Sequence, residues 1–516
     1  MNGAECLLRT LLVNGVDTCF MNPGTSEMHF VSALDRVAEM RAVLCLFEGV
    51  CSGAADGYAR MTRRPAATLL HLGPGLANAL SNFHNARKAR SPVVSVVGQH
   101  STGHLRHDAP LTADIEALAR PVSSYVRTVE RAQEIGKDTS AAVQAASAAP
   151  GQVATLIVPA DFSWSEAGQP GAALPRFSAP VPPVARIREA AAILRSGEPA
   201  GLLMGGGALL AAGCEPAAQL AAATGVRVFA NRYAARCECG GGRMAPLRLP
   251  YFPEPAEAVL AGLKHLILVE SRAPISFFGY PGRRSELAPE DCAIHVLASV
   301  EEHGAEALRA LARECGVESA PPPLSPAPKP EWPANARLTP DAIGRVLAHL
   351  MPQAAIVSDE AVSSGEPILR HLASAAAHDL LPVAGGSIGQ GLPVAVGAAV
   401  ACPNRKVIAL EADGSGLYTA QALWTMARER LDVVVVILAN RRYAILDIEM
   451  RRTGAGEIGP RANDMMDLTR PGVDWVKLSE GLGVEAARAA TVDEFAGRFR
   501  TAMRQRGPTL IEAMLE

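Results

Sequence analysis

The sequence carries little net charge, no long apolar run and no regular cysteine spacing. Lys and Arg number 49 and Asp and Glu 52, which gives a formal net charge of −3 at pH 7. This balance offers no electrostatic reason to expect nucleic acid or an anionic membrane as a partner. No apolar run approaches the length of a membrane span, and the first residues lack the basic-then-apolar layout of a signal peptide. The ten cysteines show no paired zinc spacing, so we expect reduced thiols in a cytoplasmic protein.

The chain length and the distribution of proline predict several domains. The 516 residues are enough for about three domains. Two proline-rich stretches, residues 165–185 and 316–340, have few apolar side chains to bury and are predicted to be linkers. The blocks around them alternate apolar, strand-like runs with helical segments, a pattern typical of parallel α/β sheets. We therefore predict an α/β fold of three doubly wound parallel-sheet domains, at residues 1–170, 186–315 and 338–516.

Residues 406–445 hold the most informative pattern. Two apolar runs, 406–410 and 433–438, are predicted to be buried parallel strands joined by a helical segment. Asp413 follows the first strand and Asn440 follows the second. Because the carboxyl ends of parallel strands meet at one edge of a sheet, these two side chains are expected to converge. Two hard oxygens beside a glycine-rich turn suit a magnesium ion that bridges a bound diphosphate.

This stretch resembles a known cofactor motif. Asp-Gly-Ser at 413–415, with Asn440 following Asp413 at a spacing of 27 (440 − 413 = 27), resembles the thiamine-diphosphate motif of the 2-oxo-acid decarboxylase and acetolactate synthase family. The family usually has Gly and Asn at the outer positions, where this chain has Ala412 and Ala439, but neither position is expected to hold the metal. The resemblance implies thiamine diphosphate and Mg²⁺ as cofactors, with the metal held at Asp413, Asn440 and Arg442 and the thiamine diphosphate contacted at Gly414, Ser415 and Tyr443.

Glu48 is the leading catalytic candidate. It directly follows the apolar run 42–47, so it should be at least partly buried, a setting that favours proton sharing. A buried Glu that pairs with an Arg is the plainer alternative. The segment from Glu48 to Ala-Ala-Asp-Gly-Tyr-Ala-Arg at 54–60 resembles the family's catalytic segment. There the Glu bonds the N1′ nitrogen of the cofactor's aminopyrimidine and promotes loss of the thiazolium C2 proton, a role that the resemblance implies for Glu48.

Three more candidates of the first block follow predicted strands. The turn Asn-Pro-Gly-Thr at 22–25 resembles a substrate-contacting turn of benzoylformate decarboxylase, with Thr25 at the position of a Ser; a helix N-cap is the alternative. His71 matches an active-site histidine of that enzyme and is expected to relay protons, unless backbone groups satisfy its ring. Gln99, in a Gly-Gln pair, resembles the acetolactate synthase segment at this point and is assigned to the substrate.

The third block offers a second glycine-dense segment, residues 385–391, whose backbone would pass close to a planar ring. The resemblance places Ile388 as the large apolar residue that props the cofactor into a V shape, although a turn followed by a core Ile is also possible. Ser363 would bond diphosphate oxygens or cap a helix. The cofactor contacts implied here are Gly386, Ser387, Ile388 and Ser363.

A group of three histidines and a run of three glycines are not assigned to catalysis. His100, His104 and His107 have a spacing that a metal could use on a helix, but Gly103 interrupts it, so we expect a loop that lines the substrate cleft. Residues 205–207 are three glycines without a complete dinucleotide fingerprint or a downstream acid, and we expect no FAD.

The resemblance implies an enzyme that decarboxylates a small 2-oxo acid without oxidation. The product is released as an aldehyde or joined to a second carbonyl compound. Acetolactate synthases have a Trp where this chain has Glu449, and Phe278 stands near the position of a second active-site histidine of benzoylformate decarboxylase. Glu449 is therefore assigned to the substrate, and the choice of substrate stays open. A homodimer or homotetramer with active sites between subunits is implied. The alternatives are a catalytically silent binding or regulatory homologue and a flavin-containing oxidoreductase.

Overall fold

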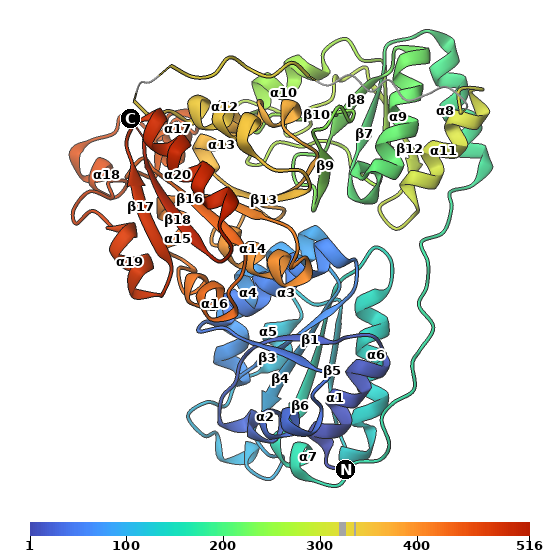
Figure 1. Cartoon of the computed structure of the whole chain (residues 1–516). Helices are drawn as coiled ribbons and strands as arrows, with labels where there is room; N and C mark the ends of the chain where they lie inside the picture. Colours follow the sequence, from blue (N-terminus) through green and yellow to red (C-terminus); the bar gives the residue numbers. More distant parts are fainter. Residues whose placement is uncertain (319–326, 335–336, 516) are drawn as a thin grey trace.

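The computed structural model of the chain describes residues 1–318, 327–334 and 337–515 (Figure 1). It contains three sheets, each covered by helices, as Figure 1 shows. The predicted first linker has no helix or strand between α7, which ends at Trp164, and α8, which begins at Val184. Part of the predicted second linker, residues 319–326 and 335–336, lies outside the described residues. No helix of the described ranges is long and apolar enough to cross a membrane.

The first sheet has six parallel strands in the order β2-β1-β3-β4-β6-β5. Its strands are β1 (Thr18–Asn22), β2 (Arg41–Leu44), β3 (Ala66–Leu70), β4 (Val93–Gln99), β5 (Tyr125–Thr128) and β6 (Val153–Pro159). The helices of this unit are α1 (Gly3–Val13), α2 (Met28–Ala33), α3 (Glu48–Thr62), α4 (Leu72–Ala89), α5 (Ile115–Ala119), α6 (Ile135–Ser147) and α7 (Ala160–Trp164).

The second sheet has five parallel strands in the order β10-β8-β7-β11-β12. Its strands are β7 (Ala200–Met204), β8 (Arg227–Ala230), β10 (Leu247–Arg248), β11 (His265–Val269) and β12 (Ala293–Ala298). The accompanying helices are α8 (Val184–Ser196), α9 (Ala211–Thr224), α10 (Pro253–Leu260) and α11 (Gly304–Glu314).

The third sheet has seven strands in the order β17-β18-β16-β15-β13-β14-β9. They are β13 (Ala355–Glu360), β14 (His378–Pro382), β15 (Val407–Ala412), β16 (Val433–Ala439), β17 (Glu485–Ala489), β18 (Thr509–Met514) and β9 (Cys237–Cys239). The helices are α12 (Pro340–Leu350), α13 (Gly365–Leu369), α14 (Gly391–Ala401), α15 (Asp413–Gly416), α16 (Ala422–Glu429), α17 (Ala444–Arg452), α18 (Pro460–Asp464), α19 (Trp475–Gly481) and α20 (Val492–Arg504).

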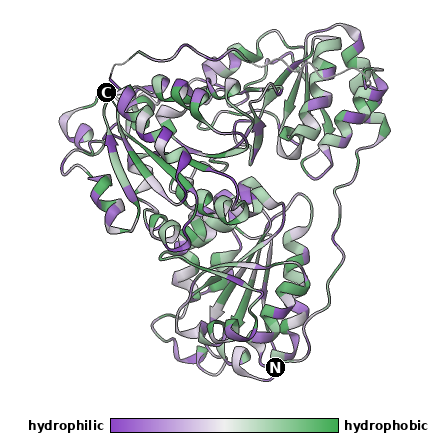
Figure 2. Cartoon of the chain, in the orientation of Figure 1, coloured by the Kyte–Doolittle hydropathy of each residue, from purple (hydrophilic) through white to green (hydrophobic). Residues whose placement is uncertain are grey.

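The strand β9 differs from the predicted all-parallel arrangement. It comes from the middle block of the sequence, yet it pairs antiparallel with β14 at the edge of the third sheet. Three residues are too few to give a periodic signal, so the sequence pattern did not indicate this strand. The other six strands are parallel neighbours, and β16 is buried at every residue, as expected for a strand covered on both faces. In Figure 2 the strands are largely green and the purple residues gather on the outer faces of helices.

Helices α3 and α14 join the first and third units by a close packing of glycines. A Cβ on Gly57 would lie 2.2 Å from the carbonyl oxygen of Val394, and one on Gly397 would lie 1.9 Å from that of Ala54. Only glycine allows the two helices to approach this closely. One apolar core therefore runs through both units. Because Glu48 begins α3, its position depends on how α3 packs against α14.

Candidate active site

The predicted convergence of Asp413 and Asn440 follows from the strand register. β15 and β16 are parallel neighbours with Ala412 opposite Leu438. Asp413 and Asn440, which follow these strands, therefore both lie at the carboxyl edge of the sheet. The Asp413 carboxylate accepts hydrogen bonds from the backbone N–H of Arg441 at 2.6 Å and of Gly414 at 3.0 Å. Burial raises the pKa of Asp413, and these two N–H groups oppose the rise. The Asn440 side-chain oxygen accepts from the N–H of Arg442 at 3.0 Å.

The residues around Asp413 and Asn440 fit a magnesium ion that is bound through a diphosphate. One carboxylate and one amide oxygen are hard ligands, and Mg²⁺ typically takes one or two such groups together with phosphate oxygens. Among the described residues no group of three or more His, Cys, Asp and Glu side chains could hold a metal by itself. The Arg442 guanidinium is bonded to Asp447 at 2.5 and 2.7 Å, so this residue can offer a metal only its backbone carbonyl.

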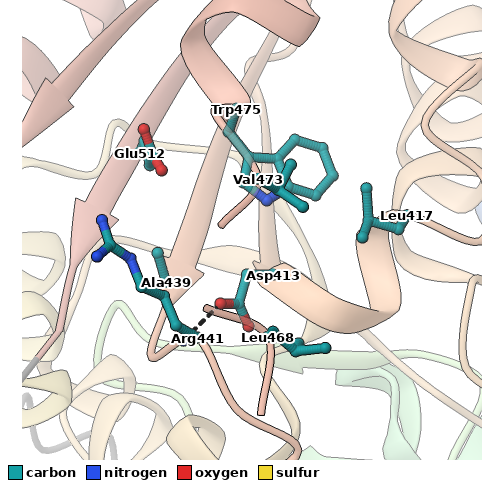
Figure 3. Close-up of a pocket in the computed structure, with 8 residues that line it drawn as sticks. All are labelled: Asp413, Leu417, Ala439, Arg441, Leu468, Val473, Trp475 and Glu512. Atoms are coloured by element: carbon teal, nitrogen blue, oxygen red, sulfur yellow. Dashed lines mark hydrogen bonds between the residues drawn. The ribbon is translucent and has the colours of Figure 1, made fainter. Parts of the chain in front are cut away.

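Figure 3 shows a small cavity beside the Asp413 carboxylate. Its lining is mainly apolar, and its charged groups are Asp413, Arg441 and Glu512. The lining also includes Leu417, Ala439, Leu468, Val473 and Trp475. Arg441 supplies the cationic side chain of this lining.

The predicted diphosphate contacts differ in how their side chains are used. The Ser415 hydroxyl donates to Glu411 at 2.8 Å, toward the interior, so only its backbone N–H is available to a ligand. The Tyr443 ring lies directly over Gly414, where a Cβ would come within 2.5 Å of a ring carbon. Ser363 lies just past β13, a neighbour of β15, and therefore at the same edge of the sheet.

Glu48 is buried, as predicted, with 8% of its surface exposed. Its two carboxylate oxygens accept hydrogen bonds from Asn22 at 3.1 Å and from Asn78 at 3.0 Å. Both of these partners are uncharged amides, so the alternative of an ion pair with Arg is not what the structure shows. The sequence pattern gave no indication that two asparagines from β1 and α4 would orient this carboxylate.

His71 forms a dyad with Glu27, which was not among the residues singled out from the sequence. The His71 Nδ1 lies 2.8 Å from the Glu27 carboxylate, which also accepts the backbone N–H of Gly24 at 2.8 Å. Burial raises the pKa of Glu27, and His71 opposes the rise. Because Nδ1 is bonded to a carboxylate rather than to backbone, the ring is oriented with Nε2 left for another partner.

The remaining candidates of the first unit surround this dyad. Thr25 is exposed and begins a 3₁₀ turn, Thr25–Glu27, with no side-chain cap hydrogen bond. A Cβ on Gly75 would lie 3.4 Å from a Glu48 oxygen and 3.5 Å from the His71 Cβ, so Glu48 and His71 are near neighbours. Gln99 ends β4, the strand beside β3, and accepts the backbone N–H of His100 at 2.8 Å. These residues therefore share the carboxyl edge of the first sheet.

The loop before α14 is held against α4 by two asparagines. Asn85 donates to the Ser387 carbonyl at 2.8 Å, and Asn82 donates to the carbonyls of Gly389 at 3.0 Å and of Gly49 at 2.9 Å. Gly386 has a φ of +79°, and the Phe277 ring lies where its Cβ would be. Ile388 is half-buried beside these contacts. The glycine-dense segment thus lies close to the residue that follows Glu48.

Glu449 contacts the middle unit. Its carboxylate accepts from the Tyr280 hydroxyl at 3.1 Å, and the Arg452 guanidinium lies 5.0 Å from the centre of the Tyr280 ring. Phe278 is 49% exposed and packs edge-on against Phe277. The position that holds a Trp in acetolactate synthases is therefore occupied by a carboxylate bonded to a tyrosine. His100 and His104 lie in an irregular segment and His107 ends a short 3₁₀ helix, Leu105–His107, with neighbouring ring centres 5.3 and 5.7 Å apart. That this segment lines the substrate cleft stays a prediction.

A pair of buried carboxyl groups, Glu360 and Glu411, lies beneath the site and was not singled out from the sequence. Glu360 accepts the backbone N–H groups of Gly389 at 2.6 Å and Gln390 at 2.7 Å, and also that of Gly391. Burial raises the pKa of Glu360 to about 7, against the effect of these N–H groups. Burial and the neighbouring Glu360 raise the pKa of Glu411 well above its usual value.

This pair predicts a specific dependence of stability on pH. In the folded state the pKa of Glu360, about 7, exceeds the ordinary glutamate value of 4.5. The folded state therefore binds more protons, and stability falls as the pH rises from about 4.5 to about 7. Between pH 5 and pH 8, the free energy of unfolding should fall by up to about 3 kcal/mol less in Glu360→Gln than in the wild type. Urea unfolding at the two pH values measures this difference. The exposed Glu480→Gln serves as control. Parallel pH profiles for the wild type and Glu360→Gln would contradict this expectation.

The fold and this arrangement define a thiamine pyrophosphate enzyme. The N-terminal thiamine-pyrophosphate-binding domain of these enzymes matches residues 1–118, and the C-terminal thiamine-pyrophosphate-binding domain matches residues 369–513. The chain belongs to this family, which confirms the predicted class of enzyme and its cofactor thiamine diphosphate.

Similar proteins of this family are named either as acetolactate synthases or as benzoylformate decarboxylases. The chain is 50% identical to a Mycobacterium tuberculosis protein named as a candidate acetolactate synthase large subunit, IlvX, over 100% of this chain and 99% of the relative. It is 30% identical to benzoylformate decarboxylase of Pseudomonas aeruginosa, over 97% and 96% of the two chains. A thiamine-diphosphate-dependent 4-hydroxybenzoylformate decarboxylase of Rhodococcus jostii has a similar structure, with a TM-score of 0.88, 25% identity and coverage of 100% and 99%.

Proposed function

We propose that this enzyme decarboxylates a small 2-oxo acid without oxidation, using thiamine diphosphate and Mg²⁺. The product leaves as an aldehyde or is joined to a second carbonyl compound. The observation that carries the proposal is the convergence of Glu48 and the His71–Glu27 dyad at one edge of the first sheet. The third sheet presents Asp413 and Asn440 at its own carboxyl edge. When bound, thiamine diphosphate supplies the electron sink that decarboxylation requires.

The residues of the chain have separate tasks in this proposal. Glu48, held by Asn22 and Asn78, exchanges a proton with N1′ of the aminopyrimidine. His71 carries protons at Nε2 to or from the substrate, because its Nδ1 is bonded to Glu27. Thr25 and Gln99 contact the substrate. Residues 386–388, Ser363, the α15 backbone and Tyr443 hold the cofactor, and Asp413, Asn440 and the Arg442 carbonyl hold the metal.

The active site is proposed to form between two subunits of a cytoplasmic homodimer or homotetramer. Within the described part of one chain, no hydrogen bond joins Glu48 to Asp413 or Asn440, and the partners of Glu48 both come from the first unit. In this proposal, which follows the family resemblance, a second copy brings its own Asp413 edge to Glu48.

Contacts in the middle unit support the expectation that no flavin is bound. Gly207 follows β7 and Gly304 begins α11, at the sheet edge where a dinucleotide phosphate would use their N–H groups. The Glu270 carboxylate accepts both N–H groups, at 2.5 and 2.6 Å. A negative side chain already placed there disfavours a phosphate. The visible spectrum of the purified protein tests this directly.

Product analysis across 2-oxo acids tests the proposed function. Protein loaded with thiamine diphosphate and Mg²⁺ is incubated with pyruvate and with benzoylformate, and carbon dioxide, aldehyde and acetoin-type products are measured. We expect carbon dioxide from at least one acid. We expect aldehyde to exceed carboligation product, because Glu449 is engaged with Tyr280 where acetolactate synthases have a Trp. If neither acid releases carbon dioxide, the proposed substrate class is wrong.

A further inference from the structure

Two histidines and two glutamates of the middle unit form a continuous chain of contacts that the proposed function does not use. His265 begins β11 and His295 lies in β12, the edge strand of the second sheet. In the parallel register, His265 lies opposite Ala293 and His295 lies opposite Ile267, so the two imidazoles are diagonal neighbours on one face. Their ring centres are 5.2 Å apart, and His265 Nδ1 lies 3.1 Å from His295 Nε2.

The outer nitrogen of each ring contacts a carboxylate. His265 Nε2 lies 2.9 Å from the Glu198 carboxylate, and His295 Nδ1 lies 2.9 Å from that of Glu189. Glu189 belongs to α8, and Glu198 precedes β7. With a hydrogen on each outer nitrogen, the two inner nitrogens face each other and share one further hydrogen. Three hydrogens on four ring nitrogens therefore satisfy the whole chain of contacts.

We propose that the inner nitrogens of His265 and His295 bind one divalent transition-metal ion, Zn²⁺, Ni²⁺ or Cu²⁺, in place of the shared hydrogen. Imidazole nitrogen is a preferred ligand of these ions. A metal-bound histidine usually donates its other ring N–H to a carboxylate, and both rings have such a partner, in Glu198 and Glu189. The ligand arrangement of a histidine metal site, including the groups that orient the rings, is thus already present.

The distances also suit a metal. With metal–nitrogen bonds of about 2.05 Å, nitrogens 3.1 Å apart subtend an angle of about 100° at the ion, between square-planar and tetrahedral values. Because the ion would lie to one side of the line between the nitrogens, both rings need a small rotation. Their side chains are 19% and 21% exposed, which leaves access for an ion and its water ligands. No third His, Cys, Asp or Glu converges there among the described residues, so water completes the coordination.

Charge balance favours a dication at this point. Glu198 and Glu189 bring two negative charges to two imidazoles, and the nearby Lys264 is paired with Asp291. A dication between neutral rings would therefore complete a neutral group. The bound ion would cross-link β11 to the edge strand β12, and through Glu189 to α8. In Figure 1, α8 and β12 lie far from α3 and α15, so this site is separate from the proposed active site.

Metal titration tests the proposal. The holoenzyme with thiamine diphosphate and Mg²⁺ is titrated with Zn²⁺ by calorimetry and with Cu²⁺ by electron paramagnetic resonance. We expect one equivalent of Zn²⁺ to bind and the Cu²⁺ spectrum to show coupling to two imidazole nitrogens. His295→Gln should lose this binding and the two-nitrogen signal, whereas Glu189→Gln should weaken binding about 10- to 100-fold.

A matched histidine variant separates this site from other imidazoles. His104→Ala removes an exposed ring from the group of His100, His104 and His107, and we expect it to leave the two-nitrogen signal unchanged. A Zn²⁺-dependent rise in Tm should occur in the wild type and in His104→Ala but not in His295→Gln. The proposal is overturned if His295→Gln binds Zn²⁺ as tightly as the wild type, or if the signal is lost with His104 instead. Neither result bears on decarboxylation.

Discussion

Replacing Glu48 with Gln is expected to slow decarboxylation about 10²- to 10⁴-fold, the usual contribution of a positioned proton-transfer group. The Gln side chain is nearly the same size but has no ionisable oxygen to exchange a proton with N1′ of the aminopyrimidine. Its N–H₂ group would also face one of the Asn22 and Asn78 amides that now donate to Glu48. The measurement is hydrogen–deuterium exchange at C2 of the bound cofactor, followed by nuclear magnetic resonance, together with carbon dioxide release.

The control for this variant is Glu39→Gln, an exposed glutamate of the same unit. We expect exchange at C2 and turnover to be unchanged in the control, and both proteins to bind thiamine diphosphate. If Glu48→Gln exchanges the C2 proton at the wild-type rate, Glu48 does not have the assigned role, although the cofactor and fold would be unaffected.

The second large effect is expected at the ion pair that connects the first and third units. Arg60 and Asp56, one turn apart on α3, are both fully buried and joined at 2.6 and 2.8 Å. Arg60 also donates to the carbonyl of Pro382 at 2.8 Å, and Asp56 accepts from Gln390 at 2.8 Å. Arg60→Met should lower the free energy of unfolding by about 3–5 kcal/mol, because it leaves a buried, unpaired charge on Asp56.

The chain offers a matched control with the same helical spacing. Arg120 and Glu116 form an exposed pair at 2.9 Å, with side chains 69% and 43% exposed, and Arg120→Met should change stability by less than about 0.5 kcal/mol. Urea unfolding of both variants measures the difference. The double variant Asp56→Asn, Arg60→Met should recover part of the loss. Equal costs for Arg60→Met and Arg120→Met would show that burial does not set the strength of the pair.

Much of the architecture and the cofactor class could be predicted from neighbouring residues alone. The runs around Asp413 and Asn440 predict two parallel strands, and the register of β15 and β16 confirms them. The burial of Glu48 was also expected from the apolar run before it. Such features depend on periodicity and turn chemistry over a few residues, and these are local properties of the chain.

Contacts between distant segments were decided only in the tertiary structure. Nothing local indicates that Glu27 meets His71, that Glu360 of β13 lies opposite Glu411 of β15, or that Glu449 bonds Tyr280. The short strand β9 likewise acquires its pairing only when β14 is beside it. The sequence alone determined which groups stand at strand ends, because each strand is encoded by its own residues. Which of those groups share a proton, an ion or a substrate depends on how separate strand ends and helices pack, and that is a property of the folded chain.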